Sequence, residues 1–426
     1  MDNTTLAPFD VASILILLAA VLGYANHRIF RLPSSVGMTL MGAVAALAII
    51  GIGALFPAWG LTPLVERFLV NIDFHAALME GMLSFLLFAG ALHVDWQEMR
   101  ANRAAIFALA TLGVVLSTAI IGVGTWWIAG LVGLSIPLAW ALVFGALISP
   151  TDPVAVMAIL KRAAVPPSLQ ATVAGESLFN DGIGVVVFVI LLGVASGQAE
   201  FTWSHAASDF AREALGGAAF GALIGWIAFR AMRSIDEYTV EVTISLAVVM
   251  AGYSLAHALH VSGPVAMAVA GLLIGNAGVE QAMSDVTRDY LIKFWVLIDE
   301  VLNAVLFLLI GLEVILVSLQ PGLLLFGLLT LPLALFARWL SVSAPLVLLR
   351  KVINLGPMAV PTLVWGGLRG GISIALALSL PSGPYRAPIV AATFVIVLFA
   401  VILQGGTIGG LISRLSRREL VRGEEA

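Results

Sequence analysis

Apolar stretches long enough to cross a bilayer follow one another along almost the whole chain. A spanning helix needs roughly 20 apolar residues, and the sequence holds thirteen such stretches. Helices are expected near 11–29, 34–55, 74–93, 104–130, 136–160, 168–194, 210–232, 239–260, 263–277, 292–317, 322–349, 357–380 and 386–413. The sequence therefore predicts an all-α polytopic membrane protein with a single transmembrane domain, 1–426.

The composition excludes several classes of protein. The chain is 61% hydrophobic and 11% charged, whereas a soluble domain is about half apolar and about a quarter charged. It has no cysteine, so disulfides, thiolate metal sites and thiol redox chemistry are not available to it. The first residues lack a basic region and a cleavage site, so the first apolar run is interpreted as a retained helix. No cofactor and no nucleic-acid partner are expected.

The positions of the basic residues predict the orientation. With the N-terminus outside, most lysines and arginines fall on the cytoplasmic side, as the positive-inside rule requires. These are Arg28, Arg31, Arg100, Arg103, Lys161, Arg162, Arg230, Arg233, Arg288, Lys293, Arg350, Lys351, Arg414, Arg417, Arg418 and Arg422. Arg67, Arg212 and Arg386 fall outside. The count of helices is therefore odd, and residues 414–426 form a short cytoplasmic tail.

Two of the expected helices are interrupted. The stretch 136–160 contains SPTDPV at 149–154, and the stretch 357–380 contains GGLRGG at 366–371. Proline removes a backbone donor and glycine loosens the helix. The two helices take matching positions if repeats of about 11–194 and 239–413 are joined by a linker helix, 210–232. Paired broken helices indicate an inverted-repeat transporter with a binding site near the membrane midplane.

The first break places Thr151 and Asp152 at membrane depth. A carboxylate beside unwound backbone carbonyls is an oxygen-rich environment of the kind that binds sodium. In the alternative interpretation, Asp152 caps the second half of a kinked structural helix.

A second polar group lies in AGESLFNDGIG, 174–184. Glu176 and Asn180 are four residues apart and share one helix face, and Ser177 and Asp181 share the adjoining face. One face can bind an ion while the other makes a structural ion pair. A carboxyl group at this depth can hold a proton or a cation, which exchange requires. The alternative is a polar cluster that only ties helices together.

Two arginines, Arg338 and Arg369, lie within predicted helices. A buried guanidinium needs an acidic partner, and Glu176 is the natural partner of one of them, although the sequence does not choose which. A structural role is favoured because an arginine repels a cation. Other polar residues at membrane depth are Glu80, Asn303, Glu313 and Ser373, expected to bond between helices, and Asp299 and Glu300, which offer alternative partners for Arg338.

Five blocks, in this order, resemble the monovalent cation:proton antiporter-1 family, the bacterial relatives of the eukaryotic sodium/proton exchangers. They are GALISPTDPVAV, GESLFNDGIGVVVF, SGPVAMAVAGLLIGN, FLLIGLEV and WGGLRGGISIALALSLP. The resemblance implies a thirteen-helix sodium/proton-antiporter fold with two crossed broken helices. It also implies a homodimer, with a dimer domain and a mobile six-helix core.

The same resemblance implies residue roles. The family's sodium site corresponds to Thr151, Asp152, Ser177 and Asp181, its Glu and Asn to Glu176 and Asn180, and its helix-twelve arginine to Arg369. Relatives often carry a carboxylate after LLF in the third helix. Here that residue is Ala89, and Glu80 lies over two turns earlier. The long cytoplasmic regulatory domain of the eukaryotic exchangers is absent, which favours a protein of the bacterial inner membrane.

These observations predict a secondary antiporter that exchanges Na⁺ for H⁺ by alternating access, with Li⁺ and K⁺ as further candidate cations. Asp181 is the expected carrier, completed by Asp152, Thr151 and Ser177. Asparagine does not titrate and arginine stays charged, so Asn180 and Arg338 leave one carrier group and predict electroneutral exchange. The alternatives are a K⁺/H⁺ antiporter and, from another class, a gated cation channel. A membrane-embedded enzyme is disfavoured because no nucleophile and base pair lies at membrane depth.

Overall fold

The computed structural model describes residues 8–60, 77–152, 165–197, 202–278, 282–316, 320–351 and 355–424, with single positions at 63, 65, 66, 68, 69, 156, 157, 160 and 353. Within these residues the regular elements are helices, and the one isolated strand pairing joins Asp152 to Leu368.

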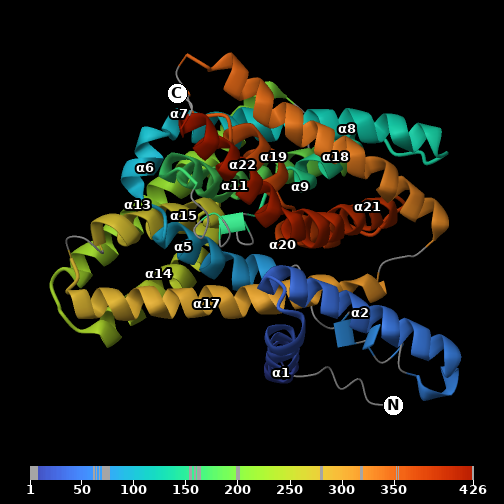
Figure 1. Cartoon of the computed structure of the whole chain (residues 1–426), viewed down its shortest axis with the longest axis horizontal. Helices are drawn as coiled ribbons and strands as arrows, with labels where there is room; N and C mark the ends of the chain where they lie inside the picture. The colour runs from blue at the N-terminus through green and yellow to red at the C-terminus, as the bar shows by residue number, and fades with distance from the viewer. Residues whose placement is uncertain are drawn as a thin grey trace.

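The helices follow the chain in this order (Figure 1). They are α1 (Pro8–Ala25) with a π-turn to Phe30, α2 (Ser34–Leu55), α5 (Leu83–Leu92) after a π-turn from Ala77, α6 (Trp96–Ala101), α7 (Arg103–Ala108), α8 (Val114–Leu131), α9 (Leu138–Ile148), α11 (Pro167–Ala195), α12 (Trp203–Phe210), α13 (Gly216–Met232), α14 (Tyr238–Ala258), α15 (Gly263–Leu273), α17 (Asp285–Leu312), α18 (Pro321–Leu348), α19 (Ala359–Gly366), α20 (Gly371–Leu378), α21 (Arg386–Phe399) and α22 (Gly405–Glu424). Short π-turns also join α7 to α8, α12 to α13 and α21 to α22.

The helices confirm the predicted all-α membrane architecture. Within the described residues, nine helices are long and apolar enough to cross a bilayer, and Ala77–Leu92, Leu138–Ile148 and Gly263–Asn276 are shorter apolar helices. With the α19–α20 pair, they account for all thirteen predicted stretches. The division of the chain into two repeats and a linker helix remains a prediction.

Helix ends differ from the expected bounds where polar residues carry a helix past its apolar run. Helix α17 begins at Asp285 rather than near 292, because the side chain of Ser284 accepts a hydrogen bond from the Thr287 amide and caps the first turn. Helix α22 continues to Glu424, so the predicted tail is largely the end of the last helix. Counting apolar residues misses such helix ends, because their polar residues can be solvated by water and do not extend the apolar run.

Two groups of helices make up the molecule. In one group α8, α9, α11, α18 and α21 pack against each other, and in the other α2, α5, α13, α14, α15 and α17 do so. Figure 1 shows the first group in the upper half of the view and α14, α17, α1 and α2 in the lower half. Helix α20 packs against α9 and α21 of the first group, so contacts of α11 with α15 and of α20 with α17 join the groups. The site described below lies where they meet.

Helices α2 and α17 approach each other especially closely. A Cβ on Gly42 would lie 2.8 Å from the carbonyl oxygen of Leu308, and a Cβ on Gly311 would lie 2.5 Å from that of Thr39. The Thr39 hydroxyl also donates to the carbonyl oxygen of Phe307 at 3.1 Å. Since neither glycine position leaves room for a side chain, α2 and α17 pack backbone to backbone.

Candidate ion-binding site

The two broken helices meet at their breaks. Helix α9 ends at Ile148, and α19 and α20 are separated by residues 367–370. The amide of Asp152 donates to the carbonyl oxygen of Leu368 at 2.9 Å, so the unwound segments pair as a short antiparallel bridge near the middle of the molecule (Figure 1). Both predicted interruptions are therefore present. Pro153 lies outside the described residues.

Thr151 connects this bridge to α11. Its amide donates to Oδ1 of Asn180 at 3.3 Å, and its hydroxyl oxygen accepts from Nδ2 of Asn180 at 2.8 Å. The hydroxyl groups of Thr151 and Ser177 are 3.2 Å apart. All three residues are buried. The side-chain amide of Asn180 thus satisfies backbone and side-chain groups of an unwound segment at membrane depth, where water is scarce.

Glu176 pairs with Arg338. Nη1 and Nη2 of Arg338 donate to the two carboxylate oxygens at 2.5 and 2.9 Å, and both residues are buried. Nε and Nη2 of Arg338 also donate to the carbonyl oxygen of Leu363, at 3.1 and 2.8 Å. The bidentate pair therefore links α11 and α18 to the last turns of α19, just before the break.

Arg369 lies in the break and is also buried. Its Nη1 donates to the carbonyl oxygen of Gly367 at 3.3 Å. The ion pair that the structure describes for Glu176 is with Arg338, which settles a choice that the sequence left open. Asp299 and Glu300, the other partners considered for Arg338, lie on the wall of the cavity described next.

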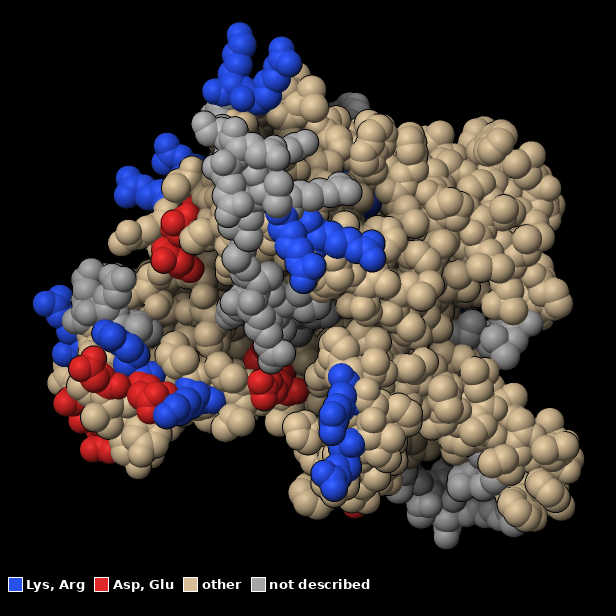
Figure 2. All heavy atoms as spheres, viewed as in Figure 1, with Lys and Arg blue, Asp and Glu red and all other residues tan. Residues whose placement is uncertain are grey.

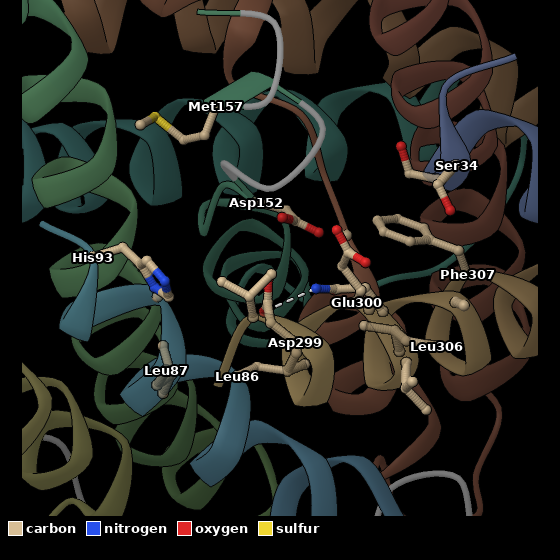
Figure 3. Close-up of a pocket in the computed structure, with 18 of the residues that line it drawn as sticks. Ser34, Leu86, Leu87, His93, Asp152, Met157, Asp299, Glu300, Leu306 and Phe307 are labelled. Carbon is tan, nitrogen blue, oxygen red and sulfur yellow. Dashed lines mark hydrogen bonds between the residues drawn. The ribbon is translucent and has the colours of Figure 1, made fainter. Parts of the chain in front are cut away.

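A cavity of about 1310 Å³ reaches the break, and Thr151, Asp152 and Asp181 are on its wall. In Figure 3 the carboxylates of Asp152, Asp299 and Glu300 point into the same space. The rest of the wall comes from the ends of several helices and loops, including Arg31, His93, Asp95, Glu98 and Gln170. The cavity wall therefore runs from these carboxylates to the segment after α1, the start of α6 and the start of α11.

Sequence reasoning missed His93, Asp95 and Glu98 of this cavity, which come from the turn between α5 and α6 and from the first turn of α6. It noted Asp299 and Glu300, in the middle of α17, only as possible partners of Arg338 and not as part of a cavity. Segments this far apart show no common pattern in the sequence. Ala89, which occupies the position of the acid expected in relatives, is fully buried. The side chain of Glu80 lies outside the described residues, so its possible replacement of that acid remains open.

The break of α19–α20 requires a glycine beside Asp152. A Cβ on Gly370 would lie 2.4 Å from Oδ2 and 2.7 Å from Cβ of Asp152. We expect Gly370→Ala to displace the Asp152 carboxylate and to reduce cation-dependent proton transport in proteoliposomes severely. Gly406→Ala in α22 is the matched control, since a Cβ there meets nothing within 4 Å. If Gly370→Ala transports protons as fast as Gly406→Ala, transport does not depend on the close approach of Gly370 to Asp152.

The protein has apolar spans, two helices broken at the same point, and carboxylates on the wall of a deep cavity. Together these features define a secondary transporter. The family model described as "Sodium/hydrogen exchanger, transmembrane" matches residues 16–414. The chain belongs to this sodium/hydrogen exchanger family.

Similar proteins cover nearly the whole chain. It is 45% identical to the Na⁺/H⁺ antiporter NhaP of Pseudomonas aeruginosa, over 95% of this chain and 96% of that protein. It is 32% identical to the Na⁺/H⁺ antiporter NhaH of Halobacillus dabanensis, over 94% and 97%. A solved structure of the sodium proton antiporter MjNhaP1 from Methanocaldococcus jannaschii superposes with a TM-score of 0.73 at 20% identity, covering 95% of this chain and 97% of that one. This last match establishes the shared fold.

Proposed function

We propose that this protein exchanges Na⁺ for H⁺ across a membrane, with Asp181 as the group that carries either ion. The observation that carries the proposal is the placement of Asp152 and Asp181 on one cavity wall, at the meeting point of two broken helices. The names of the relatives, which are Na⁺/H⁺ antiporters, support it. Thr151 and Ser177 supply further oxygens, and Asp152 supplies a second negative charge.

The remaining polar residues hold this site in place. The Glu176–Arg338 pair joins α11 to α18, and the Asn180–Thr151 contacts join α11 to the unwound segment after α9. Arg369 bonds to the backbone of its own break. In alternating access the cavity is the path to one side of the membrane, and the two groups of helices move relative to each other to open the other side.

The proposal extends to location and assembly. Figure 2 shows charged side chains gathered over the left of the view, where α6, α7 and α22 lie in Figure 1, while the right is largely uncharged. With the positive-inside rule, this asymmetry supports an inner-membrane protein whose cavity opens to the cytoplasm, with the N-terminus outside and the C-terminus inside. We also propose a homodimer, as the family resemblance implies.

Cation-dependent dissipation of a pH gradient in proteoliposomes tests the function. We expect Na⁺ added opposite the proton gradient to drive proton movement, and omission of the cation to stop it. Stronger coupling to K⁺ than to Na⁺ would instead identify a K⁺/H⁺ antiporter. Proton flux or cation flux that continues without its counter-ion would identify a channel.

We expect the exchange to be electroneutral. Asn180 does not titrate and Arg338 is held in an ion pair, so one proton on Asp181 is replaced by one Na⁺ while Asp152 stays ionised. An imposed membrane potential should therefore leave the rate and end point of the Na⁺-dependent pH change unaltered. Clear acceleration by the potential would show that more than one proton moves for each Na⁺.

A further inference from the structure

Helix α17 presents a polar turn to the cavity. Asp299, Glu300 and Asn303 all lie on the cavity wall, whereas the residues that follow, 304–312, are apolar apart from one glycine. Asp299 is half-buried, Glu300 is exposed and Asn303 is 7% exposed. None of these residues is part of the site made by α9, α11 and the α19–α20 break.

The hydrogen bonding of Asn303 leaves one buried acceptor without a donor. Its Nδ2 donates to Oδ1 of Asp299 at 3.0 Å, the dashed line in Figure 3. Because a carboxylate only accepts, this contact fixes which end of the amide faces Asp299. The other end, Oδ1, is buried and has no hydrogen-bond partner. Burying an acceptor without a donor costs free energy, so a water or an ion is expected to bind to it.

We propose that Asn303 Oδ1 is a ligand of a second monovalent-cation position in the cavity, with Asp299 and Glu300 supplying the negative charge. Amide and carboxylate oxygens are the ligands that hard cations prefer. One half-buried carboxylate balances a single positive charge, and the exposed Glu300 is screened by solvent. The inference rests on the proposed exchange, because the same cation then passes to Asp152 and Asp181.

The position lies beside the contact between the two groups of helices. One turn beyond Asn303, Leu306 packs on Gly371 at the start of α20, where a Cβ would lie 2.5 Å from Leu306 Cδ1. Next to Gly371, Gly370 contacts Asp152. A cation held at Asn303 therefore sits on α17, in one group, and faces the group that carries Asp152. This placement allows Asn303 to influence which cation reaches the carrier carboxylate.

The test compares Asn303→Leu with the parent in proteoliposomes, with Li⁺, Na⁺ and K⁺ measured separately. The substitution changes no charge, so its effect cannot come from altered electrostatic attraction. We expect the apparent constant for Na⁺ to rise about fivefold, the size expected when one polar contact is lost. This rise in the apparent Na⁺ constant should persist in high choline chloride. The apparent constants for Li⁺, Na⁺ and K⁺ should rise by different factors relative to the parent. By contrast, the effect of Glu300→Gln should fade as salt increases.

A second variant and a control separate ligation from structural damage. Asn303→Asp keeps an oxygen at this position and should lower the apparent Na⁺ constant. If Asn303→Leu does not fold, this variant decides whether Asn303 is a cation ligand. Thr393→Val is the control, because the Thr393 hydroxyl is buried in α21 and bonds to Ile389 of its own helix, away from the cavity.

The outcomes distinguish this inference from the proposed function. Parent protein without Na⁺-driven proton movement would refute the exchange itself. Parent protein that exchanges normally, with Asn303→Leu shifting all three cations by one common factor or by none, would refute the second position alone. A raised constant in Asn303→Asp would refute it as well.

Discussion

Asp181→Asn should reduce Na⁺-dependent proton movement to the level of protein-free liposomes. Asp181 is 6% exposed and lies on the cavity wall with Asp152 and Thr151. Asparagine has nearly the same size and shape, so packing in α11 is preserved. Its amide neither binds and releases a proton nor offers a negative charge to a cation, so both halves of the exchange are lost together.

Asp285→Asn makes the same chemical change outside the site. Asp285 begins α17, and its side chain is 98% exposed. We expect this control to transport like the parent, and both variants to unfold at the parent's temperature in detergent. Near-normal turnover by Asp181→Asn would remove Asp181 from the role of carrier and would leave Asp152 as the remaining candidate.

Arg338→Leu should destabilise the protein more than any surface substitution. Leucine removes both bonds to Glu176 and both bonds to the Leu363 carbonyl oxygen, and it strands the carboxylate of Glu176, whose side chain is 2% exposed. Removing one partner of a buried ion pair typically costs about 3–5 kcal/mol in the free energy of unfolding. Thermal unfolding in detergent should show a large drop in the midpoint.

Removing the stranded charge should restore much of this loss. In Glu176→Gln combined with Arg338→Leu, the buried carboxylate is gone, and replacing a whole buried pair is often nearly neutral. Arg414→Leu, at an exposed position of α22, is the control for loss of one arginine. If Arg338→Leu melts like the parent but needs much more Na⁺, the ion pair serves cation binding rather than stability.

The spans and the two breaks could be predicted because each depends on a short stretch of sequence. Bilayer thickness sets the length of an apolar run. Clusters of proline or glycine around polar residues, SPTDPV and GGLRGG, marked the two breaks, whereas Pro332 and Pro345 lie inside the continuous helix α18. The i, i+4 spacing also placed Glu176 and Asn180 on one face, but it did not reveal that their partners differ. Glu176 contacts Arg338, whereas Asn180 reaches across to Thr151.

The wall of the cavity could not be predicted because it depends on how distant helices are placed side by side. Hydropathy indicates where along its own helix, and so at what depth, a residue lies. It does not indicate the direction in which the side chain points. The sequence therefore offered Asp299 only as a possible partner of Arg338 and Asn303 only as a contact between helices, whereas Asn303 bonds to Asp299 of its own helix. The tertiary arrangement brings them to the same space as Asp152 and Asp181.

The Glu176–Arg338 pair joins two helices that are synthesised at different times. The two residues are 162 positions apart in the chain, so the ribosome delivers Glu176 to the membrane long before its counter-charge is synthesised. Until α18 is inserted, α11 carries a carboxylate at membrane depth without the guanidinium that neutralises it. A chain truncated before α18 therefore lacks the guanidinium that neutralises Glu176, and it leaves that carboxylate without its ion-pair partner.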